Sequence, residues 1–294
     1  MTHFFKLLWV SVIILILGLF SIKPILADDL VQIKSRGVIR HLGVPYANFV
    51  TGSGDGMDVE LVKLFADHIG VTYEYVKTTW AEVIGDLTGK KIIVDGDALR
   101  TVGDVTVKGD IIANGFTVLD WRKKIVDYST PVFPTQVWLI ARADSTLKPI
   151  IPTGKTDSDI AQVKAMLNGT SLMGVAGTCL DPDLYDVKKT GAIVQLFAGN
   201  LNQIAPAIMN SESDTALLDV PDALIALAKW PGKIKIIGPV SGTQEMGVAF
   251  AKTAPLLRAE FNQFLSGIKK DGTFNKLVKK YYPAVFDYYP YFFK

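Results

Sequence analysis

Several polar side chains follow predicted strands in this 294-residue chain, near the point where each strand ends. These side chains belong to Thr117, Arg122, Thr178 and Asp219. The strands are expected at residues 110–113, 171–175 and 215–220. Because ligands in open α/β sheets bind outside the carboxyl ends of the strands, we expect the four side chains to line one cleft.

Other kinds of site find little support in the sequence. Cys179 is the only cysteine, which excludes an intrachain disulfide and a cysteine-rich metal centre, and leaves either a small buried side chain or a free thiol. The three histidines lack metal-ligand spacing. Residues 52–56 are glycine-rich, but no Gly-Lys-Ser/Thr follows, so we interpret them as a turn. No nucleophile elbow and no acid/base pair stands out, so no catalytic residue is predicted.

Composition narrows the class of protein. Hydrophobic residues make up 49% of the chain and charged residues 20%, which is typical of a globular protein. The 31 basic and 29 acidic residues give a net charge of +2, too balanced for a protein that binds nucleic acid by neutralising phosphates. We therefore expect no nucleic-acid partner.

The N-terminal segment has the pattern of an export signal. Lys6 precedes an uncharged run at residues 7–22, and Ala27 provides a small residue before two aspartates. We predict a signal peptide over residues 1–27, cleaved after Ala27, and hence a periplasmic protein. An uncleaved membrane anchor is the alternative, although a spanning helix needs about 20 apolar residues.

The rest of the chain alternates strand and helix patterns. Strands are expected at residues 37–44, 71–76, 110–113, 136–141, 171–175, 193–197, 215–220 and 234–237. Helices are expected at residues 57–69, 81–87, 160–167, 201–209, 221–230 and 254–270, with another after the cap Asp181 and Pro182. This alternation predicts α/β sheets, which the chain length divides between two lobes.

Two segments depart from the alternation. Residues 89–109 are rich in valine, aspartate, glycine and lysine, and Asp95 and Gly96 form a turn signal, so we predict a β-hairpin insertion. At the other end, eight of the fourteen residues from 281 to 294 are aromatic. This tail is interpreted as a strap on the first lobe, or alternatively as a patch for a partner or membrane surface.

Four stretches of sequence, taken in order, carry a resemblance to a known family. They lie at residues 56–61, 122–131, 216–219 and 270–283. Together they resemble the periplasmic solute-binding proteins of amino-acid ABC transporters, the extracellular family 3 type. The resemblance implies a type II-like, two-lobe Venus-flytrap fold with residues 28–139 and 239–294 in lobe 1, and residues 140–238 in lobe 2. It also implies a membrane permease as partner, a monomer and no cofactor.

The resemblance assigns roles to several residues. The family's arginine, which matches Arg122, forms a forked pair with the ligand's α-carboxylate, a task that suits a planar guanidinium. Asp219 matches the residue that binds the α-ammonium, and Thr117 and the backbone at Gly115 match further carboxylate contacts. Thr178 stands at a predicted helix start, where amides favour an anion. Structural alternatives remain open: a surface arginine, a helix cap, and plain loops.

Aromatic residues are expected to form the walls of the site. Trp80 matches a wall position of the family, and Tyr46 and Phe49 lie in the first loop, which also contributes to the wall. An aromatic face supplies apolar area and attracts a cation, although core packing is the alternative for each of the three. Relatives that bind basic amino acids carry an acid in the first loop. Residues 43–46 contain none, so lysine and arginine are disfavoured as ligands.

Two other functions remain open from the sequence. A few proteins that resemble this fold are periplasmic dehydratases or carry a lytic transglycosylase domain, but no acid/base set supports an enzyme here. The insertion and the aromatic tail also suit an accessory or sensor protein that serves an oxidoreductase or receptor. The leading prediction is an exported protein that captures a small carboxylate, most simply an amino acid, for uptake.

Overall fold

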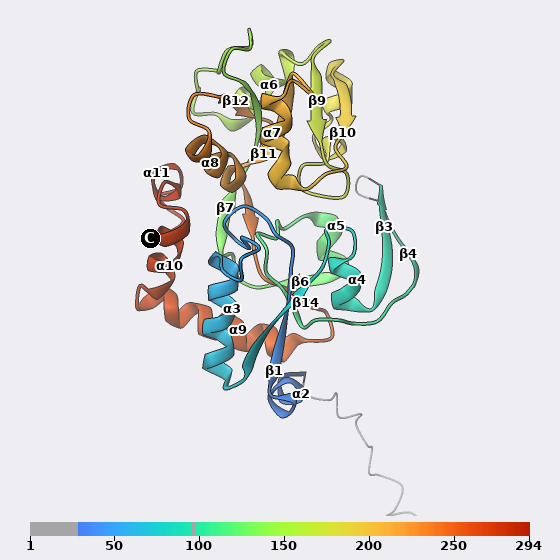
Figure 1. Ribbon diagram of the computed structural model, residues 1–294, viewed down its shortest axis with the longest axis vertical. Coiled ribbons are helices and arrows are strands. Elements are labelled where there is room, and N and C mark those ends of the chain that lie inside the picture. The colour runs from blue at the N-terminus through green and yellow to red at the C-terminus, as the bar shows by residue number, and fades with distance from the viewer. Residues whose placement is uncertain (1–28, 96–97) are drawn as a thin grey trace, which may run out of the picture.

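The computed structural model describes residues 29–95 and 98–294, and places them in two lobes stacked along the long axis (Figure 1). Each lobe is built around a five-stranded sheet with helices beside it, so the predicted two-lobe α/β fold is confirmed. The predicted signal peptide and the turn residue Gly96 lie outside the described residues. Within the described part of the chain, no helix is long and apolar enough to cross a bilayer.

The sheet of lobe 1 has the strand order β2-β1-β5-β14-β6. Its strands are β1 (Val38–Gly43), β2 (Thr72–Lys77), β5 (Ile111–Ile112), β6 (Val126–Tyr128) and β14 (Ala249–Ala251). Strand β1 is parallel to β2 and β5, whereas β14 is antiparallel to β5 and β6. The helices of this lobe are α2 (Asp29–Arg36), α3 (Met57–Ile69), α4 (Val83–Thr88), α5 (Asp120–Lys123), α9 (Pro255–Lys270), α10 (Thr273–Tyr281) and α11 (Val285–Tyr288).

Helix α3 shows how the sequence sets these elements. Leu61, Val62 and Phe65 recur at helical spacing and are all buried against the sheet. Gly70 ends the helix with a left-handed φ of 73°, and its amide donates to the last carbonyls of the helix. The observed bounds are those predicted from the apolar spacing and the terminal glycine.

The sheet of lobe 2 has the strand order β10-β9-β11-β8-β12. Its strands are β8 (Val137–Arg142), β9 (Ser171–Gly174), β10 (Ile193–Leu196), β11 (Thr215–Asp219) and β12 (Ile234–Pro239). Its α-helices are α6 (Thr156–Ala165), α7 (Ile204–Met209) and α8 (Val220–Lys229). Three short 3-10 helices accompany them: η1 (Pro182–Tyr185), η2 (Val187–Thr190) and η3 (Leu201–Gln203).

Two predicted helices of lobe 2 differ from the structure. The helix expected after Asp181 is only the pair of 3-10 turns η1 and η2, because Asp186 between them takes a left-handed φ of 54°. Asp181 still caps the first turn by accepting the amide of Asp183. Helix α6 begins at Thr156 rather than at residue 160, because acidic residues in its first turn favour a helix N-terminus.

Two short strands join the lobes. Strand β7 (Phe133–Thr135) pairs antiparallel with β13 (Gln244–Met246), forming a two-stranded connection between the five-stranded sheets. The chain enters lobe 2 through β7 and β8, and returns through β12 and β13. Rotation about this paired connection is the simplest way to separate the lobes.

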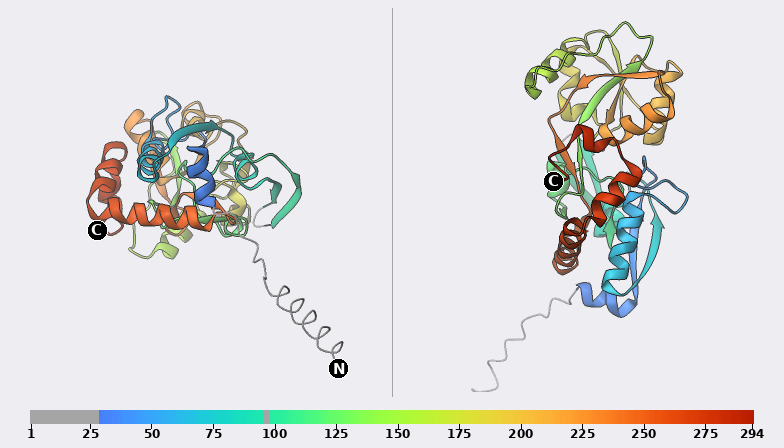
Figure 2. Two further views of the ribbon diagram at one scale, coloured as in Figure 1. Left: turned by 90° about the horizontal axis from the view of Figure 1, so that it is seen from below. Right: turned by 90° about the vertical axis from the view of Figure 1, so that its left-hand side faces the viewer.

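The predicted hairpin insertion is present in lobe 1. Strands β3 (Lys90–Asp95) and β4 (Ala98–Asp104) pair antiparallel and form a ribbon beside α4 (Figure 1). The C-terminal tail lies on lobe 1 near the connection between the lobes (Figure 2). In this tail, Tyr282 is buried, and its ring centroid lies 4.9 Å from that of Phe133. The ring centroid of Tyr288 lies 5.7 Å from that of Trp138 in β8.

Candidate functional site

Arg122 is a buried arginine without a carboxylate partner. It lies in the short helix α5, is 2% exposed, and places its guanidinium 4.0 Å from the centre of the Phe116 ring. Its Nη1 donates to the carbonyl of Thr117 at 2.9 Å. Its Nε has no hydrogen-bond partner, and no carboxylate among residues 29–95 and 98–294 forms an ion pair with it. The charge is therefore not neutralised within the described chain.

Asp219 is a buried carboxylate that has no basic partner among the residues that the structure describes. It ends β11, caps helix α8 and is fully buried. One oxygen accepts the hydroxyl of Tyr46 and, at 3.3 Å, the amide of Asp222, while the other accepts the thiol of Cys179 at 3.6 Å. Burial raises the pKa of Asp219 to about 6, although these hydrogen bonds partly oppose the shift.

The two charges belong to one seam between the lobes. Tyr46 comes from the loop after β1 and bonds across the seam to Asp219. Cys179 lies in lobe 2, close enough to Asp219, Arg122 and Thr117 for all three to act on its pKa, which burial raises to about 12. We call Tyr46, Thr117, Arg122, Cys179 and Asp219 the interlobe cluster.

Further hydrogen bonds hold the lobes together at this seam. The amide of Ala47 donates to Asn202 of η3 at 2.8 Å. The side-chain amide nitrogen of Gln244 in β13 lies 3.5 Å from the hydroxyl oxygen of Tyr185 in η1. The interlobe cluster is thus enclosed, and a ligand can reach it only if the lobes separate.

Several polar atoms at or beside the cluster are buried without a partner. They are Trp80 Nε1, Thr117 Oγ1, Arg122 Nε and Gln244 Oε1. Each buried, unsatisfied polar group costs about 1–3 kcal/mol, so native proteins contain few of them. A small ligand that carries both donors and acceptors can satisfy such atoms together with the charges of Arg122 and Asp219.

The structure brings two predicted wall residues to the cluster. The ring of Tyr46 meets that of Trp80 edge-on at 5.6 Å, and Trp80 stacks on Phe116 at 6.4 Å. Phe116 in turn carries the guanidinium of Arg122. These aromatic rings therefore form a continuous wall on the lobe 1 side of the seam.

Other predicted residues have partners elsewhere. Phe49 is fully buried in the core of lobe 1, 5.0 Å from the Tyr282 ring, so it packs rather than lining the seam. A Cβ on Gly115 would lie 2.4 Å from Phe49, and the amide of Gly115 donates to Asp58 at 2.7 Å. The hydroxyl of Thr178 donates to the carbonyl of Val175 at 2.8 Å within its own turn.

The structure adds to the site several residues that the sequence did not assign to it. Phe116 could have been predicted, because it lies between the predicted site residues Gly115 and Thr117. Cys179 follows Thr178 directly, and Asp222 lies one helical turn after Asp219, on the same side of α8. Gln244 has no such signal, because it reaches the seam from a distant part of the chain.

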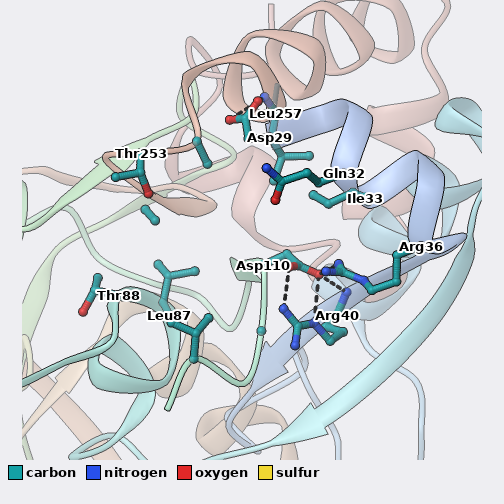
Figure 3. A pocket seen from close by; sticks show the side chains of 14 residues that line it. Asp29, Gln32, Ile33, Arg36, Arg40, Leu87, Thr88, Asp110, Thr253 and Leu257 are labelled. Atoms are coloured by element: carbon teal, nitrogen blue, oxygen red, sulfur yellow. Dashed lines mark hydrogen bonds and ion pairs between the residues drawn. The ribbon is translucent and has the colours of Figure 1, made fainter. Parts of the chain in front are cut away.

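A separate cavity of about 420 Å³ lies beside α2 (Figure 3). Helix α2 lies at the end of lobe 1 away from lobe 2 (Figure 1). Here Asp110 forms ion pairs with Arg36 at 2.5 Å and with Arg40 at 2.9 Å. Asp29 accepts the first amides of α9, from Leu256 and Leu257. We call this the Asp110 pocket. Its charged groups are already paired with one another, unlike those of the interlobe cluster.

Two α/β lobes, a paired-strand connection and opposite unpaired charges at their seam define a two-lobed binding protein. Comparison with known proteins specifies the family. The sequence profile of bacterial extracellular solute-binding proteins, family 3, matches residues 105–284. The chain belongs to this family and is a solute-binding protein.

Individual relatives are distant but match over most of this chain. The chain is 26% identical over 290 residues to the membrane-bound lytic murein transglycosylase F of Desulfosudis oleivorans, covering 96% of this chain and 57% of that protein. It therefore spans little more than half of that relative. The L-cystine-binding protein TcyJ of Escherichia coli is 25% identical over 295 residues, with 95% of each chain covered.

A solved structure shows the same fold. A mutant of ArgBP from T. maritima superposes with a TM-score of 0.68 at 26% identity, covering 87% of this chain and 99% of that one. The similarity extends over both lobes and their connection, because it includes nearly the whole of the solved chain.

Proposed function

We propose that this chain is an exported, periplasmic protein that captures an amino acid between its lobes and delivers it to an ABC-transporter permease. The observation that carries this proposal is the pair of opposite buried charges, Arg122 and Asp219, which lack protein counter-ions within the described chain. A buried charge is costly unless it is paired. An amino-acid zwitterion supplies the missing partner for both.

Each residue of the cluster has a defined task in this proposal. Arg122 binds the α-carboxylate with two parallel N–H donors, and Thr117 adds its unpartnered hydroxyl. Asp219 accepts the α-ammonium from the lobe 2 side. Trp80 and Tyr46 enclose the aliphatic part of the ligand. Because these contacts come from both lobes, binding favours the closed state over the open one.

Binding, rather than catalysis, is the role that suits this site. The relatives TcyJ and ArgBP, whose names describe binding, match along nearly their whole length. The family description and the predicted signal peptide support export. We propose a monomer that works without a cofactor.

Isothermal titration calorimetry with a panel of L-amino acids and L-cystine tests the proposal. At least one member of the panel is expected to bind the wild type. Arg122→Ala is then expected to weaken this binding by about 2–5 kcal/mol, because a buried ligand carboxylate loses its partner. Arg40→Ala is the matched control and leaves the affinity unchanged, since Arg40 belongs to the Asp110 pocket. Wild-type affinity in Arg122→Ala would overturn the site.

A further inference from the structure

Asp222 is a second buried carboxylate beside Asp219. It lies in the first turn of α8 and is 6% exposed. Within residues 29–95 and 98–294, its carboxylate accepts no hydrogen bond and forms no ion pair. It lies within electrostatic reach of Tyr46, whose hydroxyl donates to Asp219. The lobe 2 side of the seam therefore presents two neighbouring carboxylates, and neither forms an ion pair with a basic residue of the described chain.

Asp219 alone has little room for an ammonium. A carboxylate has about four lone-pair sites, two on each oxygen. The Tyr46 hydroxyl and the Asp222 amide use the two sites on Oδ1, and the Cys179 thiol uses one on Oδ2. An ammonium brings three N–H donors, so Asp219 can accept only one of them without losing a present bond. The other donors need further acceptors, and Asp222, whose amide already bonds to Asp219, supplies a carboxylate with no partner among the described residues.

We propose that Asp222 is a second ligand-binding carboxylate, and that Asp219 and Asp222 share a proton that the cationic group of the ligand displaces. This inference rests on the proposed function, because it places the ligand's ammonium at the same site. In the ligand-free protein one carboxyl of the pair keeps its proton. On binding, both become carboxylates facing the ammonium, and the proton leaves to solvent.

The electrostatics of the pair agree with this exchange. Burial raises the pKa of Asp219 to about 6, and burial together with the nearby charge of Asp219 raises the pKa of Asp222 well above its usual range. Two adjacent buried carboxylates titrate as a coupled pair, and the last proton is held up to higher pH. A cation placed between them favours the doubly ionised state.

The other groups that face the pair do not titrate near neutral pH. They are Tyr46 from the loop after β1, Cys179 from the turn after β9, Tyr185 of η1, Tyr282 at the end of α10, and Tyr289 after α11. Burial raises the pKa of each of them, so all five stay neutral. Arg122 lies close enough to Cys179 for its charge to act on the pKa of the thiol. Asp58, whose pKa burial raises to about 7, is the competing source of a proton in this region.

A second observation places a ligand at the same point. Trp80 meets Tyr46 edge-on, and its Nε1 is buried without a partner. Arg122 Nε and Thr117 Oγ1 are likewise buried without a partner, and both residues act on the pKa of Cys179, whose thiol donates to Asp219. The two carboxylates therefore lie beside buried polar atoms that have no hydrogen-bond partner among the described residues, and they are more than an acidic helix start.

Proton release during binding tests the inference. Each amino acid of the panel that binds is titrated at pH 7.5 in two buffers with different ionisation enthalpies. Histidine and cysteine are left out because their side chains titrate near this pH. The wild type is expected to release about one proton per bound molecule, and its affinity rises threefold or more from pH 7.0 to pH 8.0. Asp222→Asn releases almost none, and its affinity changes less than twofold.

Two further variants control the measurement. Asp159→Asn changes another buried carboxylate of lobe 2, outside the seam, and is expected to release as many protons as the wild type. Asp222→Glu keeps the carboxylate and restores the release. If Asp222→Asn fails to fold, titration of the wild-type carboxyl carbons by NMR, with and without the bound amino acid, counts the same proton.

The possible failures are distinguishable. If the wild type binds an amino acid but releases no proton, the inference is wrong and the proposed function stands. If Asp222→Asn still releases a full proton, the proton comes from another group, with Asp58 the first to examine, and the inference is again overturned. If no member of the panel binds, the proposed function fails and the inference fails with it.

Discussion

Arg122 and Arg40 occupy opposite electrostatic situations within lobe 1. Arg40 lies in β1, at the edge of the Asp110 pocket, where its side chain is 26% exposed and paired with Asp110. Arg36 shares the same carboxylate from helix α2. Arg122 is more deeply buried, at 2% exposure. Its guanidinium contacts the Phe116 ring and the carbonyl of Thr117, whereas that of Arg40 contacts a carboxylate.

This comparison distinguishes paired charges, which stabilise the fold, from unpaired charges, which are suited to binding a ligand. In the Asp110 pocket the carboxylate accepts both guanidinium groups and the amide of Arg40 at 2.8 Å, so its polar atoms are satisfied in place. In the interlobe cluster, desolvation is not offset by a counter-charge from the described chain. A charge in that position does not increase stability, which leaves recognition as its role.

The largest expected effect on stability comes from breaking the Asp110 pocket. Asp110→Ala removes the partner of two arginines and a backbone acceptor, so the free energy of unfolding is expected to fall by about 2–3 kcal/mol. Amino-acid affinity should not change, because the pocket lies far from the seam (Figure 1). Chemical denaturation and calorimetry measure the two quantities. A parallel loss of affinity would show that the regions are coupled.

Arg122→Met is expected to change the free energy of unfolding in the opposite direction, and so to stabilise the protein. An apolar side chain of similar length removes a buried, unneutralised charge, and such replacements are often stabilising. Loss of the contacts with Phe116 and Thr117 offsets part of the gain, so we expect an increase in stability of about 1–2 kcal/mol together with loss of binding. Thermal unfolding measures the change. A clear decrease in stability would place Arg122 with Arg40, among charges that support the fold.

Much of the fold follows from local patterns in the sequence. The bounds of α3 agree because apolar spacing and Gly70 act within one segment. The hairpin at residues 89–109 was also predicted, since alternating strands and a turn signal are local. The prediction of a helix after Asp181 was wrong, because Asp186 takes a left-handed conformation after a single turn. Aspartate tolerates that conformation but does not require it, so the residue type alone does not end a helix.

The candidate site could be predicted only in part. The end of a predicted strand located Asp219, because the carboxyl edge of a sheet follows from topology. The choice of Arg122 depended also on the resemblance to the family. The sequence does not reveal which polar atoms find partners, since these depend on distant segments. The amide of Gly115 is used by Asp58, and Phe49 enters the core beside Tyr282, whereas its neighbour Tyr46 crosses the seam.

The smallest expected effect comes from the tail, which affects the seam without touching its charges. Tyr288 of α11 contacts Trp138 at the start of the lobe 2 sheet, so the contact spans the connection between the lobes. Aromatic pairs contribute about 0.5–1.5 kcal/mol beyond their buried area. If the contact favours the closed state, Tyr288→Ala weakens amino-acid binding about fivefold, as expected for a loss of about 1 kcal/mol.

The matched control for this last variant is Tyr291→Ala. Tyr291 belongs to the same tail but is 81% exposed, and its ring contacts only the nearby Lys294 among the cations and rings of the described residues. Its removal is expected to leave both binding and stability unchanged. Equal effects of the two substitutions would mean that the tail acts through general packing on lobe 1. An effect of Tyr288→Ala alone would mean that closure of the lobes depends on the contact between Tyr288 and Trp138 as well as on the charges of the interlobe cluster.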